Sequence, residues 1–225
     1  MTKIVLVRHG EALCNVDRTV EAVATCRGLT PLGVLQGIAT AERFEVEGFK
    51  PDVLLSSPIR RAAETATLIA ERLNVEPVLD SDLEEVRPGE AEGMTWDQYF
   101  AFYGTTEGWQ PSVPFAPGAE AWTTFAARVA NAIDRVARSY AGATVLLVTH
   151  GGVVDASLFH FFGLDPEKQP PIDFSTSNAS ITEWERARYP PNPLAKSPQP
   201  EVHRWRLGRY NDAAHVSALR LRPPT

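Results

Sequence analysis

Histidine follows a short apolar run at two places in the chain. Residues 4–7 lead through Arg8 into His9, and residues 145–148 lead, one residue further on, into His150. A glycine comes directly after each histidine, and its small size lets a ligand approach the backbone closely. A neutral histidine ring can attack phosphorus, and an arginine beside it can bind phosphate oxygens. The two junctions therefore indicate an active site with the residue types that phosphoryl chemistry needs.

Charged side chains also follow the other two apolar runs, residues 53–55 and 75–79. They are two arginines and two glutamates, namely Arg60, Arg61, Glu84 and Glu85. Several arginines around one point select a multiply charged anion, of which phosphate is the commonest. A nearby carboxylic acid can protonate a leaving alcohol and then deprotonate the water that discharges a phosphorylated histidine. Such a site requires no metal, because the arginines stabilise the charge on the phosphoryl oxygens.

These side chains meet only if the four apolar runs are strands of one sheet. Continuous runs rich in β-branched residues are typical of strands buried on both faces of a parallel sheet. The ligand crevice of an open α/β sheet lies beyond the carboxyl ends of its strands. Four stretches have helical spacing: residues 31–44, 59–73, 121–140 and 153–162. The predicted fold is α/β, with a mostly parallel central sheet and helices on both faces.

Two segments depart from this alternation of strands and helices. Residues 178–185 and 202–207 indicate two strands around a proline-rich connection, which predicts a C-terminal antiparallel hairpin. Residues 88–122 are rich in aromatic side chains and form either a lid or specificity insert over the site, or ordinary core packing. A chain of 225 residues can bury one sizeable core, so a single domain over residues 1–225 is expected.

Further motifs surround these junctions, in a fixed order along most of the chain. They are Arg8-His9-Gly10-Glu11, Asn15, Leu29-Thr30 with Gly33 and Gln36, Ser56-Ser57-Pro58 with Arg61-Ala62 and Thr65-Ala66, Leu83 with Glu85, Gly89 and Glu92-Gly93, Pro117-Gly118 with Glu120 and Arg128, and His150-Gly151-Gly152. With these motifs the chain resembles the histidine phosphatase superfamily, in the branch of the cofactor-dependent phosphoglycerate mutases and related phosphatases. Arg-His-Gly alone would be weak evidence for this family, but the complete set of motifs in this order is strong evidence for it.

The resemblance implies a role for each matched residue. His9 is expected to be the phosphorylated nucleophile, and Glu85 the general acid and base. The residues expected to line the phosphate pocket are Arg8, Arg61 and His150, with Asn15 and the Gly151 amide as further donors. Glu84 competes with Glu85, but Glu85 stands two residues after Leu83, as the family pattern requires. Arg128 is most simply an exposed helix charge. The remaining histidines are not expected to be catalytic: His160 is expected to pack or lie at the surface, and a structural role is expected for His203 and His215.

Two departures from the family pattern concern the substrate rather than the transferred phosphate. Cys26-Arg27-Gly28 stands where the family usually has an acidic residue, and Val86-Arg87-Pro88 replaces a more aromatic stretch. The connection 11–30 is long and contributes three further candidates for contact with a substrate, namely Arg18, Arg27 and Thr30. These departures therefore leave the identity of the substrate open, but not the phosphoryl chemistry.

The overall composition excludes several classes of function. A net charge of -6 gives no electrostatic case for nucleic acid or an acidic membrane surface. The first apolar run is too short for a signal peptide or a membrane span. The two cysteines, Cys14 and Cys26, lack metal-ligand spacing and are expected to be free thiols in a reducing cytoplasm. No metal and no cofactor are predicted, and the sequence does not indicate an oligomeric state.

Hydrolysis of a small-molecule phosphomonoester through a phosphohistidine is the predicted function. The alternative is a phosphoglycerate mutase, an isomerase that shields its phosphohistidine from water and binds a small carboxylated substrate. The changed stretch around Arg27 and the divergent aromatic residues 94–122 favour the phosphatase. A third alternative is a non-catalytic binding module on the same fold. Its usual sign is the loss of a key residue, and none is lost in this sequence.

Overall fold

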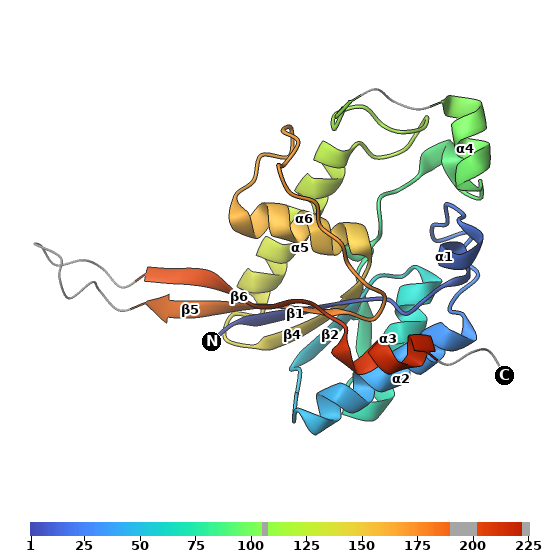
Figure 1. The fold of residues 1–225 in the computed structure, drawn as a ribbon. Coiled ribbons are helices and arrows are strands. Elements are labelled where there is room, and N and C mark those ends of the chain that lie inside the picture. Colours follow the sequence, from blue (N-terminus) through green and yellow to red (C-terminus); the bar gives the residue numbers. More distant parts are fainter. Residues whose placement is uncertain (105–107, 190–201, 222–225) are drawn as a thin grey trace, which may run out of the picture.

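A six-stranded sheet forms the centre of the computed structural model, which describes residues 1–104, 108–189 and 202–221 (Figure 1). Its strand order is β3-β2-β4-β1-β5-β6. The strands are β1 (Lys3–Arg8), β2 (Val53–Ser56), β3 (Pro77–Leu79), β4 (Thr144–Thr149), β5 (Ile181–Tyr189) and β6 (Val202–Asp212). The first four are parallel to one another, so the predicted mostly parallel α/β fold is confirmed.

The register of the strands brings the chemically active segments to one edge of the sheet. Arg8 at the end of β1 lies opposite Thr149 at the end of β4, so His9 and His150 leave the sheet as neighbours. β2 pairs in parallel with β4 and ends at the same edge, where it leads into the helix that carries Arg61. The carboxyl ends of the strands therefore converge as the sequence predicts.

Helices cover both faces of the sheet (Figure 1). α2 (Pro31–Val46) and α3 (Arg60–Leu73) pack on one face, and α5 (Trp122–Ser139) and α6 (Gly151–Phe162) pack on the other. Along β1, Ile4 and Leu6 belong to the core under α5 and α6, whereas Val5 and Val7 belong to the core under α2 and α3. Burial on both faces explains why the strand sequences are continuous apolar runs. None of the helices in the described residues is long and apolar enough to span a membrane.

A side-chain cap and a proline fix the start of α2. Thr30 is the N-cap, because its Oγ1 accepts a hydrogen bond from the Gly33 amide at 3.0 Å, and Pro31 occupies the first helical position. The Thr30 amide also donates to the Glu11 carbonyl at 2.9 Å. This bond attaches the helix start to the loop that follows His9.

The predicted C-terminal hairpin is present, and it extends the same sheet. β5 pairs antiparallel with β1, and β6 pairs antiparallel with β5. β5 ends at Tyr189 and β6 ends at Asp212, so both strands are longer at this end than predicted. The proline-rich connection predicted between them lies outside the described residues.

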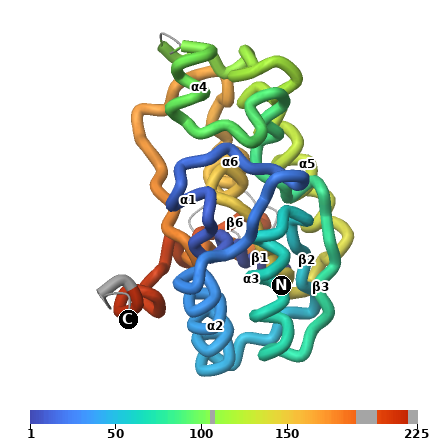
Figure 2. The backbone as a smooth tube through the Cα atoms, turned by 90° about the vertical axis from the view of Figure 1, so that its right-hand side faces the viewer, coloured from blue at the N-terminus to red at the C-terminus, as the bar shows by residue number. Residues whose placement is uncertain are grey.

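The described parts of the aromatic-rich segment, residues 88–104 and 108–122, lie beyond the carboxyl edge of the sheet, where α4 (Trp96–Tyr103) stands above α1 (Leu13–Asp17) (Figures 1 and 2). A small hydrophobic core made of Val20, Ala91, Tyr99 and Ala116 packs them against the connection 11–30. The Val20 amide donates to the Met94 carbonyl at 2.8 Å, which joins this segment to the connection 11–30. Part of the segment is therefore ordinary core packing.

Candidate active site

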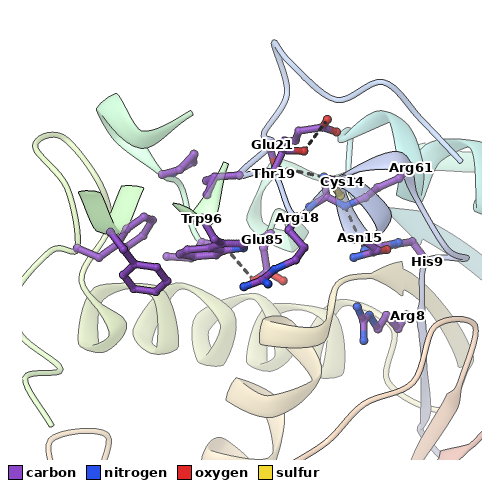
Figure 3. A pocket seen from close by; sticks show the side chains of 15 residues that line it. Arg8, His9, Cys14, Asn15, Arg18, Thr19, Glu21, Arg61, Glu85 and Trp96 are labelled. Carbon is purple, nitrogen blue, oxygen red and sulfur yellow. Dashed lines mark hydrogen bonds between the residues drawn. The ribbon is translucent and has the colours of Figure 1, made fainter. Parts of the chain in front are cut away.

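A cavity of about 730 Å³ lies beyond the carboxyl ends of the parallel strands (Figure 3). The predicted site residues that line it are Arg8, His9, Asn15, Arg18, Arg61 and Glu85. Part of its wall is apolar and includes Trp96, Phe100 and Phe115 from the segment 88–122. The structure thus brings together the histidine, the arginines and the carboxylate that the sequence analysis assigned to phosphoryl chemistry.

His9 is 3% exposed, and its ring has a defined protonation state. Nδ1 lies 2.7 Å from the Gly10 carbonyl oxygen, which can only accept, so Nδ1 carries the proton and Nε2 keeps its lone pair. Arg61 Nε donates to this lone pair at 3.1 Å. Burial, with the added charges of Arg61 and Arg8, holds the pKa of His9 well below its usual range. The ring is neutral at pH 7, and Nε2 has the lone pair that a nucleophile requires.

Buried polar groups fix the loop that follows His9. The Gly10 amide donates to Thr65 Oγ1 at 3.1 Å, and the Glu11 amide donates to Gln36 Oε1 at 2.7 Å. A Cβ added at Gly10 would lie 2.4 Å from the Gly33 carbonyl oxygen in the first turn of α2. Glycine at this position therefore serves the close packing of two backbones, rather than the approach of a ligand that the sequence suggested.

Backbone carbonyls hold the two arginines next to His9. Arg61 is 4% exposed, and its Nη1 donates to the Glu21 carbonyl at 3.2 Å. Arg8 donates from Nη1 to the carbonyl of Thr176, in the loop before β5. Two guanidinium groups held in this way present N–H donors in fixed positions, which suits the oxygens of a phosphate.

Asn15 shares its side-chain oxygen between two donors. Oδ1 accepts from the Ala12 amide at 3.0 Å and from Asn178 Nδ2 at 3.2 Å, which directs the Asn15 amide group toward the cavity. Asn178 Nδ2 also donates to the His9 carbonyl at 3.2 Å. Sequence analysis missed Asn178 and Thr176, because no local pattern shows that the loop before β5 returns to the end of β1.

Of the adjacent glutamates Glu84 and Glu85, Glu85 is the one that lines the cavity. Its Oε2 accepts from the Gly152 amide at 3.1 Å, and its Oε1 accepts from the Val86 amide at 3.0 Å. The competitor Glu84 instead forms an ion pair with Arg87 at 3.0 Å. Of the two adjacent carboxylates, Glu85 is therefore the one that can reach a leaving group in the cavity.

Gly152 leaves no room for a side chain beside Glu85. A Cβ at this position would lie 2.2 Å from Glu85 Oε1, so Gly152→Ala must displace the carboxylate. We expect kcat for phosphomonoester hydrolysis to fall about 100-fold, because a displacement of about 1 Å has an effect of that size. Gly151→Ala is the matched comparison. Its Cβ would meet Arg8 Nε at 3.6 Å, which is an ordinary contact, so kcat should fall less than in Gly152→Ala. Equal losses in steady-state kinetics would contradict the explanation.

Arg128 is not the exposed helix charge that the sequence suggested. Its side chain is largely buried, and Nη1 donates to the carbonyls of Asp82 and Glu84 at 2.9 and 3.0 Å. Nη2 donates to the Glu85 carbonyl at 3.2 Å and forms an ion pair with Glu120 at 2.6 Å. The helical spacing of α5 could not reveal the three carbonyl partners, because they belong to a segment more than 40 positions earlier in the chain. Arg128 is thus a positioning residue for the segment that carries Glu85.

We expect Arg128→Gln to reduce both stability and the rate with alkyl phosphates. Loss of the guanidinium leaves buried carbonyls without donors, which destabilises the fold by about 1–3 kcal/mol. Displacement of Glu85 should lower the rate of hydrolysis more for alkyl phosphates than for aryl phosphates, since alkyl leaving groups need more protonation. Arg138→Gln, an exposed change on the same helix, is the control. A lower melting temperature with an unchanged ratio of the alkyl to the aryl phosphate rate would limit Arg128 to a structural role.

His150 lies behind His9, outside the cavity wall. It is fully buried, its ring centroid is 5.2 Å from that of His9, and its Nε2 is 2.8 Å from Ser57 Oγ. Burial, followed by the charge of Arg61, keeps the pKa of His150 well below its usual range, so this ring is also neutral. Gly151 begins α6 next to Arg8 and does not line the cavity either. Contact of these two residues with phosphate stays a prediction.

Neither Thr30 nor Arg27 lines the cavity, and both have other partners. Thr30 caps α2. Arg27 donates from Nε to Glu21 Oε1 at 2.7 Å and from Nη1 to Asp17 Oδ2 at 2.8 Å. Both acidic partners belong to the same connection 11–30, so Arg27 is neutralised locally. Of the three residues that the sequence proposed for this connection, only Arg18 lines the cavity.

Cys14 also lines the cavity, but burial raises the pKa of its thiol, which keeps it protonated at neutral pH. Cys14 and Cys26 are both free, as expected. Within the part of the chain that the structure describes, no group of three or more His, Cys, Asp or Glu side chains could hold a metal ion. The neutral ring of His9, rather than the Cys14 thiol, is therefore the candidate nucleophile of this cavity.

Residues 4–194 match the family model of the histidine phosphatase superfamily (branch 1). The chain belongs to this superfamily. The match covers both histidines, the arginines and Glu85, so the resemblance found in the motifs is confirmed at the level of the family.

Relatives in the superfamily include phosphatases and a mutase. The metal-independent phosphoserine phosphatase of Arabidopsis thaliana is 32% identical over 165 residues, which cover 69% of this chain and 67% of the relative. The probable phosphoglycerate mutase GpmB of Yersinia pestis (strain Pestoides F) is 26% identical over 222 residues, with 96% and 95% covered. A mycobacterial glucosyl-3-phosphoglycerate phosphatase, solved in complex with inorganic phosphate, has a TM-score of 0.73 and 27% identity over 96% of this chain and 99% of that one.

Proposed function

We propose that this histidine phosphatase superfamily member hydrolyses a small-molecule phosphomonoester through a phosphohistidine on His9. The observation that carries the proposal is the neutral His9 ring, whose unprotonated Nε2 lies 3.1 Å from Arg61 Nε in a cavity that also contains Glu85. The phosphatases among the relatives support the reaction class.

In the first step, His9 Nε2 attacks phosphorus, and the bond from phosphorus to the ester oxygen breaks. The protonated Glu85 gives its proton to that oxygen, so a neutral alcohol leaves. Arg61 releases Nε2 and donates with Arg8 to the phosphoryl oxygens, and Asn15 Nδ2 is the third donor. Both arginines are already positioned by backbone carbonyls, which reduces the reorganisation that the transition state requires.

In the second step, the Glu85 carboxylate removes a proton from water as the water oxygen bonds to phosphorus. The bond from phosphorus to Nε2 breaks, inorganic phosphate leaves, and the lone pair returns to His9. The arginines supply the positive charge in both steps, so the proposed reaction needs neither a metal nor an organic cofactor. We further propose that residues 1–225 act as one catalytic domain and that the two free thiols reflect a reducing, cytoplasmic compartment.

The test is release of inorganic phosphate from a panel of small phosphomonoesters, with and without EDTA. We expect release with unchanged kcat and KM in EDTA, since the charge on phosphate is compensated by arginine. Inhibition by EDTA that one added metal ion reverses would contradict the metal-free reaction. Conversion of 3-phosphoglycerate that depends on bisphosphoglycerate, without phosphate release, would establish the mutase instead. Phosphate binding without turnover of any substrate would favour the non-catalytic module.

A further inference from the structure

The cavity has two chemically different ends. Arg8, His9 and Arg61 form the polar end, where the proposed function places the phosphate. Figure 3 shows Trp96 on the opposite side, with Arg18 and Glu85 between them. Glu85 is proposed to protonate the ester oxygen, so the alcohol part of the substrate must extend past it, toward Arg18 and Trp96.

The opposite end is an apolar wall with unusual exposure. Trp96 and Phe100 of α4 are 36% and 45% exposed, and Phe115 lines the same cavity. Large aromatic side chains gathered in a concave surface are typical of ligand sites, since soluble proteins otherwise cover such groups. A ring placed on this wall would remove water from both partners, which favours binding.

The wall is held in place before any ligand arrives. α4 begins with a capping box, in which the side-chain oxygen of Thr95 accepts from the Gln98 amide and that of Gln98 accepts from the Thr95 amide. Tyr99, behind the wall, donates from its hydroxyl to the Phe115 carbonyl at 2.8 Å. The Trp96 ring is 5.5 Å from Tyr99 and 6.0 Å from Phe100, centroid to centroid. A ligand therefore meets a largely preformed surface.

Arg18 adds a positive charge next to this wall. Its carbonyl accepts from the Trp96 amide at 2.9 Å, which places the two residues together. The proposed function assigns Arg8 and Arg61 to the phosphate, and Arg27 is paired with Asp17 and Glu21, whereas the guanidinium of Arg18 has no ion-pair partner among the described residues. An exposed guanidinium at a cavity wall selects an anionic group.

The geometry points to a substrate class: a phosphomonoester whose alcohol part is a flat, apolar ring that carries a second negative group. The ring lies against Trp96 and Phe100, and the second negative group pairs with Arg18. This inference rests on the proposed function, because that function fixes the phosphate beside His9. A cavity of about 730 Å³ is in the range of pockets that enclose ring-bearing ligands of this size.

Three synthetic substrates separate the two features: ethyl phosphate, benzyl phosphate and 4-carboxybenzyl phosphate. Their leaving alcohols have similar acidity, so differences in kcat/KM report recognition rather than leaving-group strength. We expect benzyl phosphate to exceed ethyl phosphate by about 10-fold or more, from the apolar area that the ring buries. The carboxyl group of 4-carboxybenzyl phosphate should raise kcat/KM about a further 5-fold. Added salt should reduce this second increase, as for any exposed ion pair.

Variants assign each preference to its residue. Trp96→Ala should reduce the benzyl-to-ethyl ratio toward one, and Phe100→Ala gives a second measurement of the same wall if Trp96→Ala does not fold. Phe102→Ala is the matched control, because Phe102 is on the same helix, 75% exposed and outside the cavity lining. Arg18→Gln should abolish the carboxyl preference, with Arg138→Gln as the control for a lost surface charge.

The outcomes distinguish this inference from the proposed function. Phosphate release with a benzyl-to-ethyl ratio near one, or a ratio that folded Trp96→Ala and Phe100→Ala leave unchanged, would overturn the ring-binding wall. A carboxyl preference that persists in Arg18→Gln would overturn the role of Arg18. Failure to release phosphate from any of these and the wider panel would instead reject the proposed function.

Discussion

His9→Ala is expected to lower kcat for every phosphomonoester by at least about 1,000-fold and to leave the fold intact. Removal of a nucleophile has effects of this size or larger in enzymes that form covalent intermediates. The ring is buried, but its partners are the Gly10 carbonyl and Arg61, so its loss leaves the two hydrophobic cores of the sheet unchanged. The measurement combines phosphate release with circular dichroism of the variant.

His160→Ala is the matched control for this change. His160 lies on α6, where its Nε2 is 3.2 Å from Asp134 Oδ1, and it does not line the active-site cavity. Its replacement should leave kcat within about 2-fold, as for most surface changes. A folded His9→Ala protein with wild-type turnover would exclude a phosphohistidine at this position, and the mechanism would fail with it.

Glu85→Gln is expected to slow alkyl phosphates by about 1,000-fold and aryl phosphates much less. General acid catalysis contributes about 10²- to 10⁴-fold, and its contribution is greatest where the leaving alcohol is a weak acid. Glutamine keeps the shape of the side chain and one oxygen that can accept from either the Gly152 or the Val86 amide, so the overall fold should persist. The readout is kcat for both ester types at several pH values.

Glu84→Gln provides the comparison for Glu85→Gln. Glu84 adjoins Glu85 in the sequence but pairs with Arg87, so its loss should change neither ester class by more than a few-fold. Equal losses for alkyl and aryl phosphates in Glu85→Gln would mean that another group protonates the leaving oxygen. A larger alkyl effect in Glu84→Gln would move the acid role to that residue.

The central residues of the site that the sequence predicted lie on segments that follow strands. His9 follows β1, and Arg61 and Glu85 follow β2 and β3. Apolar runs identify buried parallel strands, and the geometry of an α/β sheet then brings their carboxyl ends together. Motifs attached to those ends could therefore be placed in space without the structure, and so could the helices, whose caps and spacing are local signals.

The parts that the sequence did not reveal depend on contacts between distant segments. Arg128 has the spacing of an exposed helix residue, yet its guanidinium binds the carbonyls around Glu85. Asn178 has no motif of its own but contacts His9 and Asn15. Arg18 and Arg27 look alike in the sequence, and only the ion pairs of Arg27 with Asp17 and Glu21 separate them. Such tertiary partners are not encoded in any local pattern.

The hydrogen bond from His9 Nδ1 to the Gly10 carbonyl has a consequence for the chemical identity of the intermediate. Imidazole can be phosphorylated on either nitrogen, and the two products are distinct isomers. Because Nδ1 holds its proton against a carbonyl 2.7 Å away, the proposed phosphorylation of His9 is expected on Nε2, which would make the intermediate the τ isomer of phosphohistidine. A single backbone carbonyl thus sets the regiochemistry of the covalent step, although it never contacts the substrate.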